Sequence, residues 1–197
     1  MNEREAAWPL SLRLLHWVSA GLMVPALGLG VYTVQWVHDP AARFELTQTH
    51  KGIGITILAL TVVRLCRRGF VRAPEAAAAP WLRLAANAAH AALYLLLLAM
   101  PLSGWLMATT TPVRVPTIVL GLFALPYPLA PDLGLYRFAR TAHVALAVAF
   151  AALILLHIVA AFGHALIWRD QTLRRMWRPS RAVGDAGEAY AAMSGAD

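Results

Sequence analysis

The stretch Thr141–Trp168, TAHVALAVAFAALILLHIVAAFGHALIW, decides the fold class of this chain. It contains no Asp, Glu, Lys or Arg. At about 1.5 Å per residue it is long enough to cross the roughly 30 Å of hydrocarbon in a bilayer. A backbone in lipid must satisfy its own hydrogen bonds. The stretch is therefore predicted to be a transmembrane helix.

Three more apolar blocks have the same character and explain the composition of the chain. Hydrophobic residues make up 59% of the 197 residues and charged residues 14%, whereas soluble domains have about 45–50% and 25%. This excludes an ordinary soluble enzyme and a disordered chain. The predicted fold class is all-α: an integral membrane four-helix bundle with helices at about 11–36, 49–67, 82–108 and 140–168.

The segments between the blocks differ in character. A short outer loop is expected over Val37–Gln48, and an irregular Ala/Pro-rich inner loop over Arg67–Pro80. The longest loop contains the apolar stretch Thr117–Leu125, which is too short to span a bilayer and is interpreted as an interfacial or re-entrant lid. Residues 1–179 are assigned to one transmembrane domain, and 180–197 to a disordered cytoplasmic tail.

The basic residues indicate orientation rather than a nucleic-acid partner. The chain has 17 Lys and Arg against 10 Asp and Glu, a formal charge of +7, but these residues cluster at the ends of the apolar blocks. Of the 17, twelve lie on the side that holds both termini and five on the other side. By the positive-inside rule both termini are predicted to be cytoplasmic.

Histidines are the residues that point to chemistry, since six of the seven lie in or beside the predicted helices. Ionisable residues in a membrane are costly and are functional candidates by default. The seven are His16, His38, His50, His90, His143, His157 and His164.

The spacing of His143 and His157 favours haem. They are 14 residues apart, which at about 100° per residue places them on one helix face, roughly 21 Å apart along the axis. That separation suits two stacked haems and is too wide for one shared metal ion. The single cysteine, Cys66, and the lack of a Cys-x-x-Cys-His motif exclude covalent c-type attachment.

Each haem needs a second axial histidine at the same depth. The predicted topology places His50 opposite His143 near the outer surface. On the inner side, both His16 and His90 compete to face His157. Glycines such as Gly28, Gly52, Gly54 and Gly104 would admit a flat ring, although glycine also packs helices generally.

Histidines also occur in proton relays and in zinc sites. A proton-relay transporter usually has carboxylates in its spans, and these blocks have none. A zinc site needs three or four clustered ligands, and the two turns between His157 and His164 are wide for one.

The chain resembles the bacterial cytochrome b561 family over about residues 10–179. The residues that carry the resemblance are Leu15-His16-Trp17, HKGIGI from His50, HAALYLLL from His90 followed by PLSG from Pro101, the His143–His157–His164 pattern, GLFALPY from Gly121 and WRDQTLRRM from Trp168. The histidine layout is specific, whereas each short string alone is not.

The resemblance implies two b haems in the bacterial inner membrane. It assigns His16 and His157 to the inner haem and His50 and His143 to the outer haem. It makes His90 and His164 non-ligand residues near a cytoplasmic quinone site, where Arg13 and Trp168 are further candidates.

In size and tail the chain is most similar to the stand-alone superoxide oxidase type, which implies superoxide oxidation at the periplasmic side and ubiquinone reduction at the cytoplasmic side. Because superoxide is an anion, outer cations would steer it; the candidates are Lys51, Arg114, Arg137 and Arg140. Two alternatives stay open: an electron-transfer subunit that anchors a dehydrogenase or hydrogenase partner, and a non-redox transporter.

Overall fold

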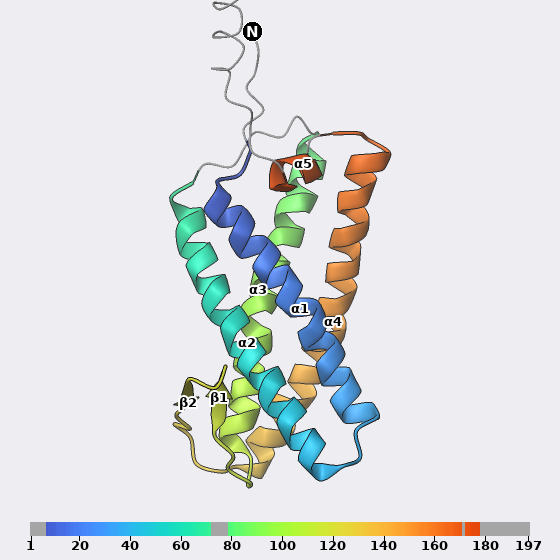
Figure 1. Cartoon of the computed structure of the whole chain (residues 1–197). Coiled ribbons are helices and arrows are strands. Elements are labelled where there is room, and N and C mark those ends of the chain that lie inside the picture. The colour runs from blue at the N-terminus through green and yellow to red at the C-terminus, as the bar shows by residue number, and fades with distance from the viewer. Residues whose placement is uncertain (1–6, 72–78, 171, 178–197) are drawn as a thin grey trace, which may run out of the picture.

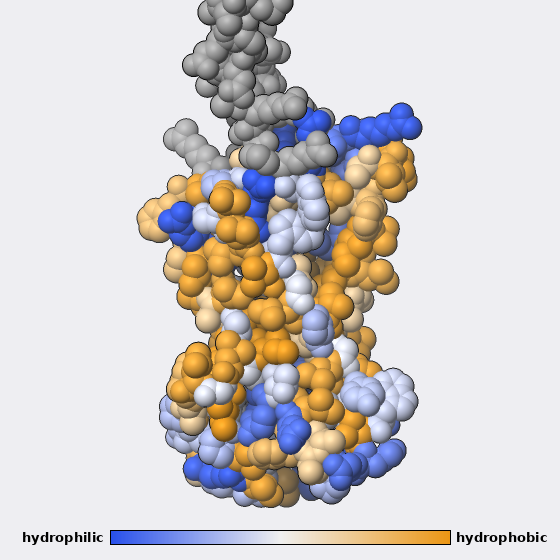
Figure 2. All heavy atoms as spheres, in the orientation of Figure 1, coloured by the Kyte–Doolittle hydropathy of each residue, from blue (hydrophilic) through white to orange (hydrophobic). Residues whose placement is uncertain are grey.

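The computed structural model describes residues 7–71, 79–170 and 172–177 and consists of four long helices in a bundle (Figure 1). The helices are α1 (Leu10–Gln35), α2 (Pro40–Gly69), α3 (Pro80–Thr110) and α4 (Leu133–Leu166). All four are long and apolar enough to cross a membrane. Figure 2 shows a largely apolar surface along the bundle, with hydrophilic residues gathered at its two ends. The predicted all-α membrane bundle is confirmed.

Two helices begin earlier than predicted, because aspartates cap their first turns. Asp39 accepts a hydrogen bond from the backbone N–H of Ala42 at 2.8 Å, and Pro40 occupies the first helical position. Asp132 accepts from Leu135 N–H at 2.9 Å. The expected outer loop over 37–48 is therefore wrong for its larger part: residues 40–48 belong to α2, and α4 starts at 133 rather than 140.

The apolar stretch over 117–125, for which an interfacial or re-entrant lid was expected, folds as a small antiparallel hairpin. It is made of β1 (Thr117–Val119) and β2 (Phe123–Leu125). Its turn places Leu120 and Gly121 at φ values of 49° and 73°, the left-handed pair that a type I′ turn requires. The hairpin packs against α2 beside Gly52, where an added Cβ would lie 3.2 Å from the Ile118 carbonyl oxygen.

The opposite end of the bundle is covered by α5 (Thr172–Trp177) (Figure 1). We call this the terminal end, and the end that carries β1 and β2 the hairpin end. Between them lies a buried apolar core from all four helices: Met23, Ala26, Ile57, Met100 and Phe150. Pro25 and Pro101 lie inside the continuous helices α1 and α3. The predicted tail 180–197 falls outside the described residues, as do residues 72–78, half of the predicted inner loop.

Candidate functional site

At the hairpin end, His50 of α2 faces His143 of α4. Their ring centres are 6.2 Å apart and their planes are nearly perpendicular, at 83°. An imidazole nitrogen bonds a metal at about 2.0–2.1 Å, with the ring centre about 1.1 Å behind it, so two imidazoles on opposite sides of one metal have centres about 6.3 Å apart. The pair therefore has the spacing of two axial ligands of one iron.

Hydrogen bonds orient both of these rings. The Nδ1 of His50 lies 3.0 Å from the Ala26 carbonyl oxygen, an acceptor, so Nδ1 carries the proton and donates it. Ser103 donates its own hydroxyl proton to the Met100 carbonyl at 2.8 Å, so its oxygen accepts from the His143 Nδ1, 2.9 Å away. In both rings Nε2 is left as the unprotonated nitrogen. Such outer hydrogen bonds are typical of metal-ligating histidines.

A cavity of about 630 Å³ surrounds this pair, within the usual range for a bound organic cofactor of roughly 300–1,000 Å³. The indole Nε1 of Trp105, a residue that lines the cavity, is buried and has no hydrogen-bond partner. A buried donor without a partner is costly. It suits a cofactor that brings an acceptor, such as a carboxylate group.

Glycines leave room for the two rings. A Cβ added to Gly30 would lie 3.0 Å from the His50 ring, and one added to Gly104 would lie 3.1 Å from the His143 ring. Of the four glycines named from the sequence, Gly104 serves this purpose. Gly52 admits the hairpin instead, and Gly28 and Gly54 have open space.

At the terminal end, three imidazoles gather. The ring centre of His157 lies 6.3 Å from that of His16 and 5.8 Å from that of His90. The first spacing again matches two axial ligands, and His90 contacts the same ring from α3. In contrast to the hairpin end, no hydrogen bond to these three rings is found within residues 7–71, 79–170 and 172–177. The described residues contain no cluster of three or more His, Cys, Asp or Glu side chains suited to a metal ion alone.

Arg64 is a residue at this end that the sequence analysis did not single out. Its guanidinium lies 5.3 Å from the centre of the Tyr94 ring, and its charge acts on His16, His90 and His157. The signal was present in the sequence: Arg64 follows His50 by 14 residues, the same spacing that links His143 to His157. Arg64 therefore shares a face of α2 with His50, about 21 Å further along the helix axis.

The residues expected at a quinone site separate into two groups. His164, at the end of α4, has its Nδ1 2.5 Å from Asp170 Oδ2 and its ring centre 4.9 Å from that of Trp168. Burial tends to raise the pKa of Asp170, but hydrogen bonds from Thr172 and His164 outweigh it and leave the pKa below its usual value. The carboxyl group is thus ionised at neutral pH.

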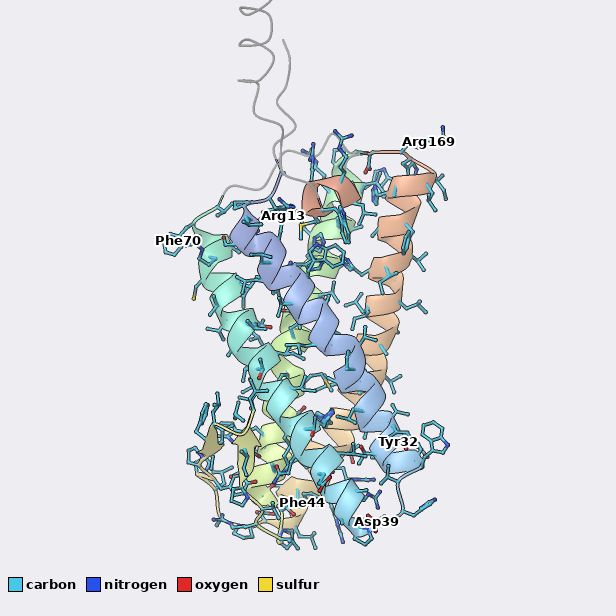
Figure 3. All side chains as sticks on the ribbon, viewed as in Figure 1. Arg13, Tyr32, Asp39, Phe44, Phe70 and Arg169 are labelled. Carbon is cyan, nitrogen blue, oxygen red and sulfur yellow. The ribbon has the colours of Figure 1, made fainter. Side chains whose placement is uncertain are left out.

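Arg13 instead joins α1 to α5 (Figure 3). Its NH2 donates to the Trp177 carbonyl at 2.6 Å and its Nε to the Met176 carbonyl at 3.3 Å. Trp17 donates to the same Met176 carbonyl at 2.9 Å, and its ring contacts that of Trp177. Arg13 therefore has a structural partner, and a role at the quinone stays a prediction.

The outer cations lie at different places around the hairpin end. Lys51 lines the cavity beside His50. Arg114 donates to the Leu129 carbonyl, and Arg137 and Arg140 are exposed on α4. Arg43, which the sequence analysis did not select, also lines the cavity. The sequence analysis predicted a loop over residues 40–48. It therefore could not predict that Arg43 and Lys51 share a face of α2.

The geometry of both ends fits haem b. Each end has two histidines at bis-ligand spacing, and the hairpin end adds free Nε2 atoms, a cavity of suitable size and an unpartnered buried donor. The two pairs come from three helices, since α4 supplies one histidine to each pair, and they lie on either side of the apolar core.

Comparison with known proteins identifies the family. The family model described as prokaryotic cytochrome b561 matches residues 7–179. The chain is 34% identical over 163 residues to "Cytochrome b561 homolog 2" of Escherichia coli, covering 82% of this chain and 86% of that protein. It is 30% identical over 171 residues to "Cytochrome b562" of Cereibacter sphaeroides, covering 84% and 91%.

Proposed function

The chain belongs to the prokaryotic cytochrome b561 family, and on that premise we propose that it oxidises superoxide at one membrane face and reduces ubiquinone at the other. That it is a membrane b-type cytochrome of electron transfer follows from the family itself. The ligand pairs, the two substrates and the bacterial inner membrane as location are the proposal.

In this proposal His50 and His143 hold one haem b at the hairpin end, and His16 and His157 hold a second at the terminal end. The ring spacings of 6.2 and 6.3 Å support the two pairs. When bound, the haems supply one-electron carriers at the two ends of the bundle. His90 contacts the ring of His157 without being its ligand partner.

The observation that supports superoxide as the substrate at the hairpin end is the positive charge of the cavity beside His50 and His143. Two cations, Arg43 and Lys51, line it, and no Asp or Glu of the described residues does so. A cleft with one sign of charge concentrates ions of the opposite sign and raises their association rate. The hairpin end is then the periplasmic face, and Arg114, Arg137 and Arg140 add to the positive field around the entrance.

The terminal end is then cytoplasmic, in agreement with the positive-inside rule. Two superoxide anions each lose one electron to become dioxygen. One ubiquinone takes up the two electrons and two protons to become ubiquinol. His164 and Trp168 lie where such a quinone would approach from the cytoplasmic side, with His90 and Arg13 on the neighbouring helices α3 and α1.

The test is reduction of decylubiquinone by the purified holoprotein under a steady flux of superoxide, alongside a reduced-minus-oxidised spectrum and a haem assay. We expect two b haems per chain and quinone reduction without a partner. The double variant Arg43→Gln/Lys51→Gln should lower the rate with superoxide about 10-fold or more and flatten its salt dependence. The matched control is Arg83→Gln, an exposed cation at the terminal end, which should leave the rate unchanged.

Three outcomes would contradict the proposal in distinct ways. Two haems without turnover would favour the subunit that needs a dehydrogenase or hydrogenase partner. Absence of a Soret band would favour a non-redox transporter. Equal loss of rate in the double variant and in Arg83→Gln would remove the argument from cavity charge.

A further inference from the structure

The chain leaves α4 through a turn that returns a carboxylate to the last histidine of the helix. Asp170 Oδ2 lies 2.5 Å from His164 Nδ1, and Asp170 Oδ1 accepts from the Thr172 N–H at 2.8 Å. The Asp170 N–H also donates to the His164 carbonyl at 3.0 Å. The pair is the only ion pair between described side chains. One aspartate thus links α4 to α5 and contacts the imidazole.

The turn itself is strained. Arg169 has φ 51°, the left-handed region that a residue with a Cβ rarely adopts (Figure 3 labels it at the end of α4). Such strain persists where the surrounding structure requires it, and it is frequent at functional sites. Here it brings Asp170 back onto His164. On the other side of the turn, Trp168 packs so closely over Gly163 that an added Cβ would lie 3.0 Å from the indole.

This geometry determines which atom of His164 is available. An ionised carboxylate only accepts, so the proton of the contact sits on Nδ1. Nε2 is then the ring nitrogen left for another partner, as in histidines oriented by a carboxylate elsewhere. The two side chains are 38% and 41% exposed, so a ligand can reach them. The Trp168 ring, 4.9 Å from the imidazole, adds an aromatic surface for a flat ligand.

We propose that Asp170 is a positioning residue that holds His164 with Nε2 directed to a quinone oxygen, so that the imidazole transfers a proton to the quinone as it is reduced. The inference rests on the quinone side of the proposed function. In the step, Nε2 first takes up a proton from water, which gives an imidazolium ion. That N–H bond then breaks and an O–H bond forms on the quinone oxygen. The second proton of the quinol comes from water, and water reprotonates His164. Asp170 stays ionised and balances the imidazolium charge.

The test separates this inference from the choice of electron donor. The holoprotein is pre-reduced with dithionite, excess reductant is removed, and reoxidation of the b band by decylubiquinone is followed, so superoxide takes no part. Asp170→Asn keeps an oxygen for the Thr172 N–H but presents an amide donor to Nδ1. Asp170→Glu keeps the carboxylate. Asp132→Asn, which alters a carboxylate that caps α4 at the other end, is the matched control.

We expect Asp170→Asn to slow reoxidation by about 10- to 100-fold, as for other residues that orient a functional histidine, with an unchanged haem spectrum. Asp170→Glu should restore part of the rate, and Asp132→Asn should equal the parent. ¹⁵N NMR of labelled histidine should show the His164 proton moving from Nδ1 to Nε2 in Asp170→Asn. Reoxidation of Asp170→Asn at the parental rate would overturn the proposal, as would a Glu variant as slow as the Asn variant. Failure of superoxide as donor would leave these results intact.

Discussion

The two ends of the bundle hold histidine pairs of nearly equal spacing, 6.2 and 6.3 Å between ring centres, in unlike surroundings. At the hairpin end, backbone and serine groups hold both Nδ1 atoms, and glycines leave space beside both rings. At the terminal end the rings have no such hydrogen bonds within the described part of the chain. Instead, the His157 ring contacts the rings of His16 and His90, and the three rings lie near the positive charge of Arg64.

The difference teaches that one spacing can be reached by two means. The hairpin-end rings are oriented in advance by neutral hydrogen bonds, which favours tight, well-defined ligation. The terminal-end rings are arranged by helix packing and lie in a positive field. A nearby cation stabilises the reduced, less positive state of an iron centre and raises its potential. Because Arg43 and Lys51 line the cavity at the hairpin end, charge alone does not set the direction in which electrons would move between the proposed haems.

The largest expected effect is the loss of one haem from one end only. His143→Ala should reduce the haem content from two to one per chain by emptying the hairpin end, and His157→Ala should do the same at the terminal end. His90→Ala should retain both, because His90 contacts His157 without being a proposed ligand. Pyridine haemochrome assays measure the content. Two haems in His157→Ala, or one in His90→Ala, would require a different ligand set.

Next come the glycines beside the hairpin-end rings. In Gly104→Ala the new Cβ would lie 3.1 Å from the His143 ring, so the ring must shift, at a cost of about 1–3 kcal/mol for overpacking. We expect partial loss of the hairpin-end haem in a dilution or apomyoglobin-transfer assay. Gly28→Ala, which has open space, should retain haem fully and gain up to about 1 kcal/mol of helix stability. Equal haem retention in the two variants would show that the close approach of Gly104 to the His143 ring has no effect on haem binding.

A smaller effect is expected from the serine that orients His143. Ser103→Ala removes the acceptor of the Nδ1–H and should weaken haem retention at the hairpin end by about 10-fold or more. Haem transfer rates measure the change. Ser103→Thr, which keeps the hydroxyl, is the control, and the terminal-end haem should be unaffected in both variants. A uniform loss at both ends would indicate a general packing defect instead.

The smallest effect concerns Arg64. Arg64→Gln should lower the midpoint potential of the terminal-end haem by on the order of tens of millivolts, where 59 mV corresponds to a tenfold change for a one-electron couple. The hairpin-end potential should stay within a few millivolts. Spectroelectrochemical titration resolves the two midpoints, and Arg64→Lys should keep most of the charge effect. An equal shift at both ends would contradict the assignment of Arg64 to one of them.

The sequence predicted the bundle and the main histidine pairs because both depend on helical periodicity. His143 and His157 share a face by spacing alone, and depth in the membrane places His50 opposite His143. Depth leaves both His16 and His90 facing His157, and the choice of His16 came from the family resemblance. The sequence analysis also gave His90 as a competing partner of His157. The two rings are in contact in the structure, with centres 5.8 Å apart. Helical geometry therefore carries information on depth and face, but not on which of two neighbouring imidazoles binds.

Features that depend on contacts between distant segments were not predictable in the same way. The polar first turns of α2 and α4 were assigned to loops, since their capping by Asp39 and Asp132 leaves no hydrophobic signal. The hairpin turn uses Leu120 at a position where Asn, Asp or Gly is usual. The return of Asp170 to His164 depends on a left-handed arginine that no pattern indicates.

The hydrogen bonds between Arg13 and α5 also have a consequence for the order of events during synthesis of the chain. The two partners are separated by 163 residues, nearly the whole chain. A ribosome adds about 5–20 residues per second, so on the order of ten to thirty seconds pass between the synthesis of Arg13 and that of Met176. During that interval α5 has not yet covered the terminal end, whereas His50 and His143 can meet as soon as α4 enters the membrane. His157, the proposed ligand at the terminal end, precedes Met176 by only 19 residues, which is about 1–4 seconds of synthesis. The time in which a cofactor could enter that end before α5 docks is therefore short.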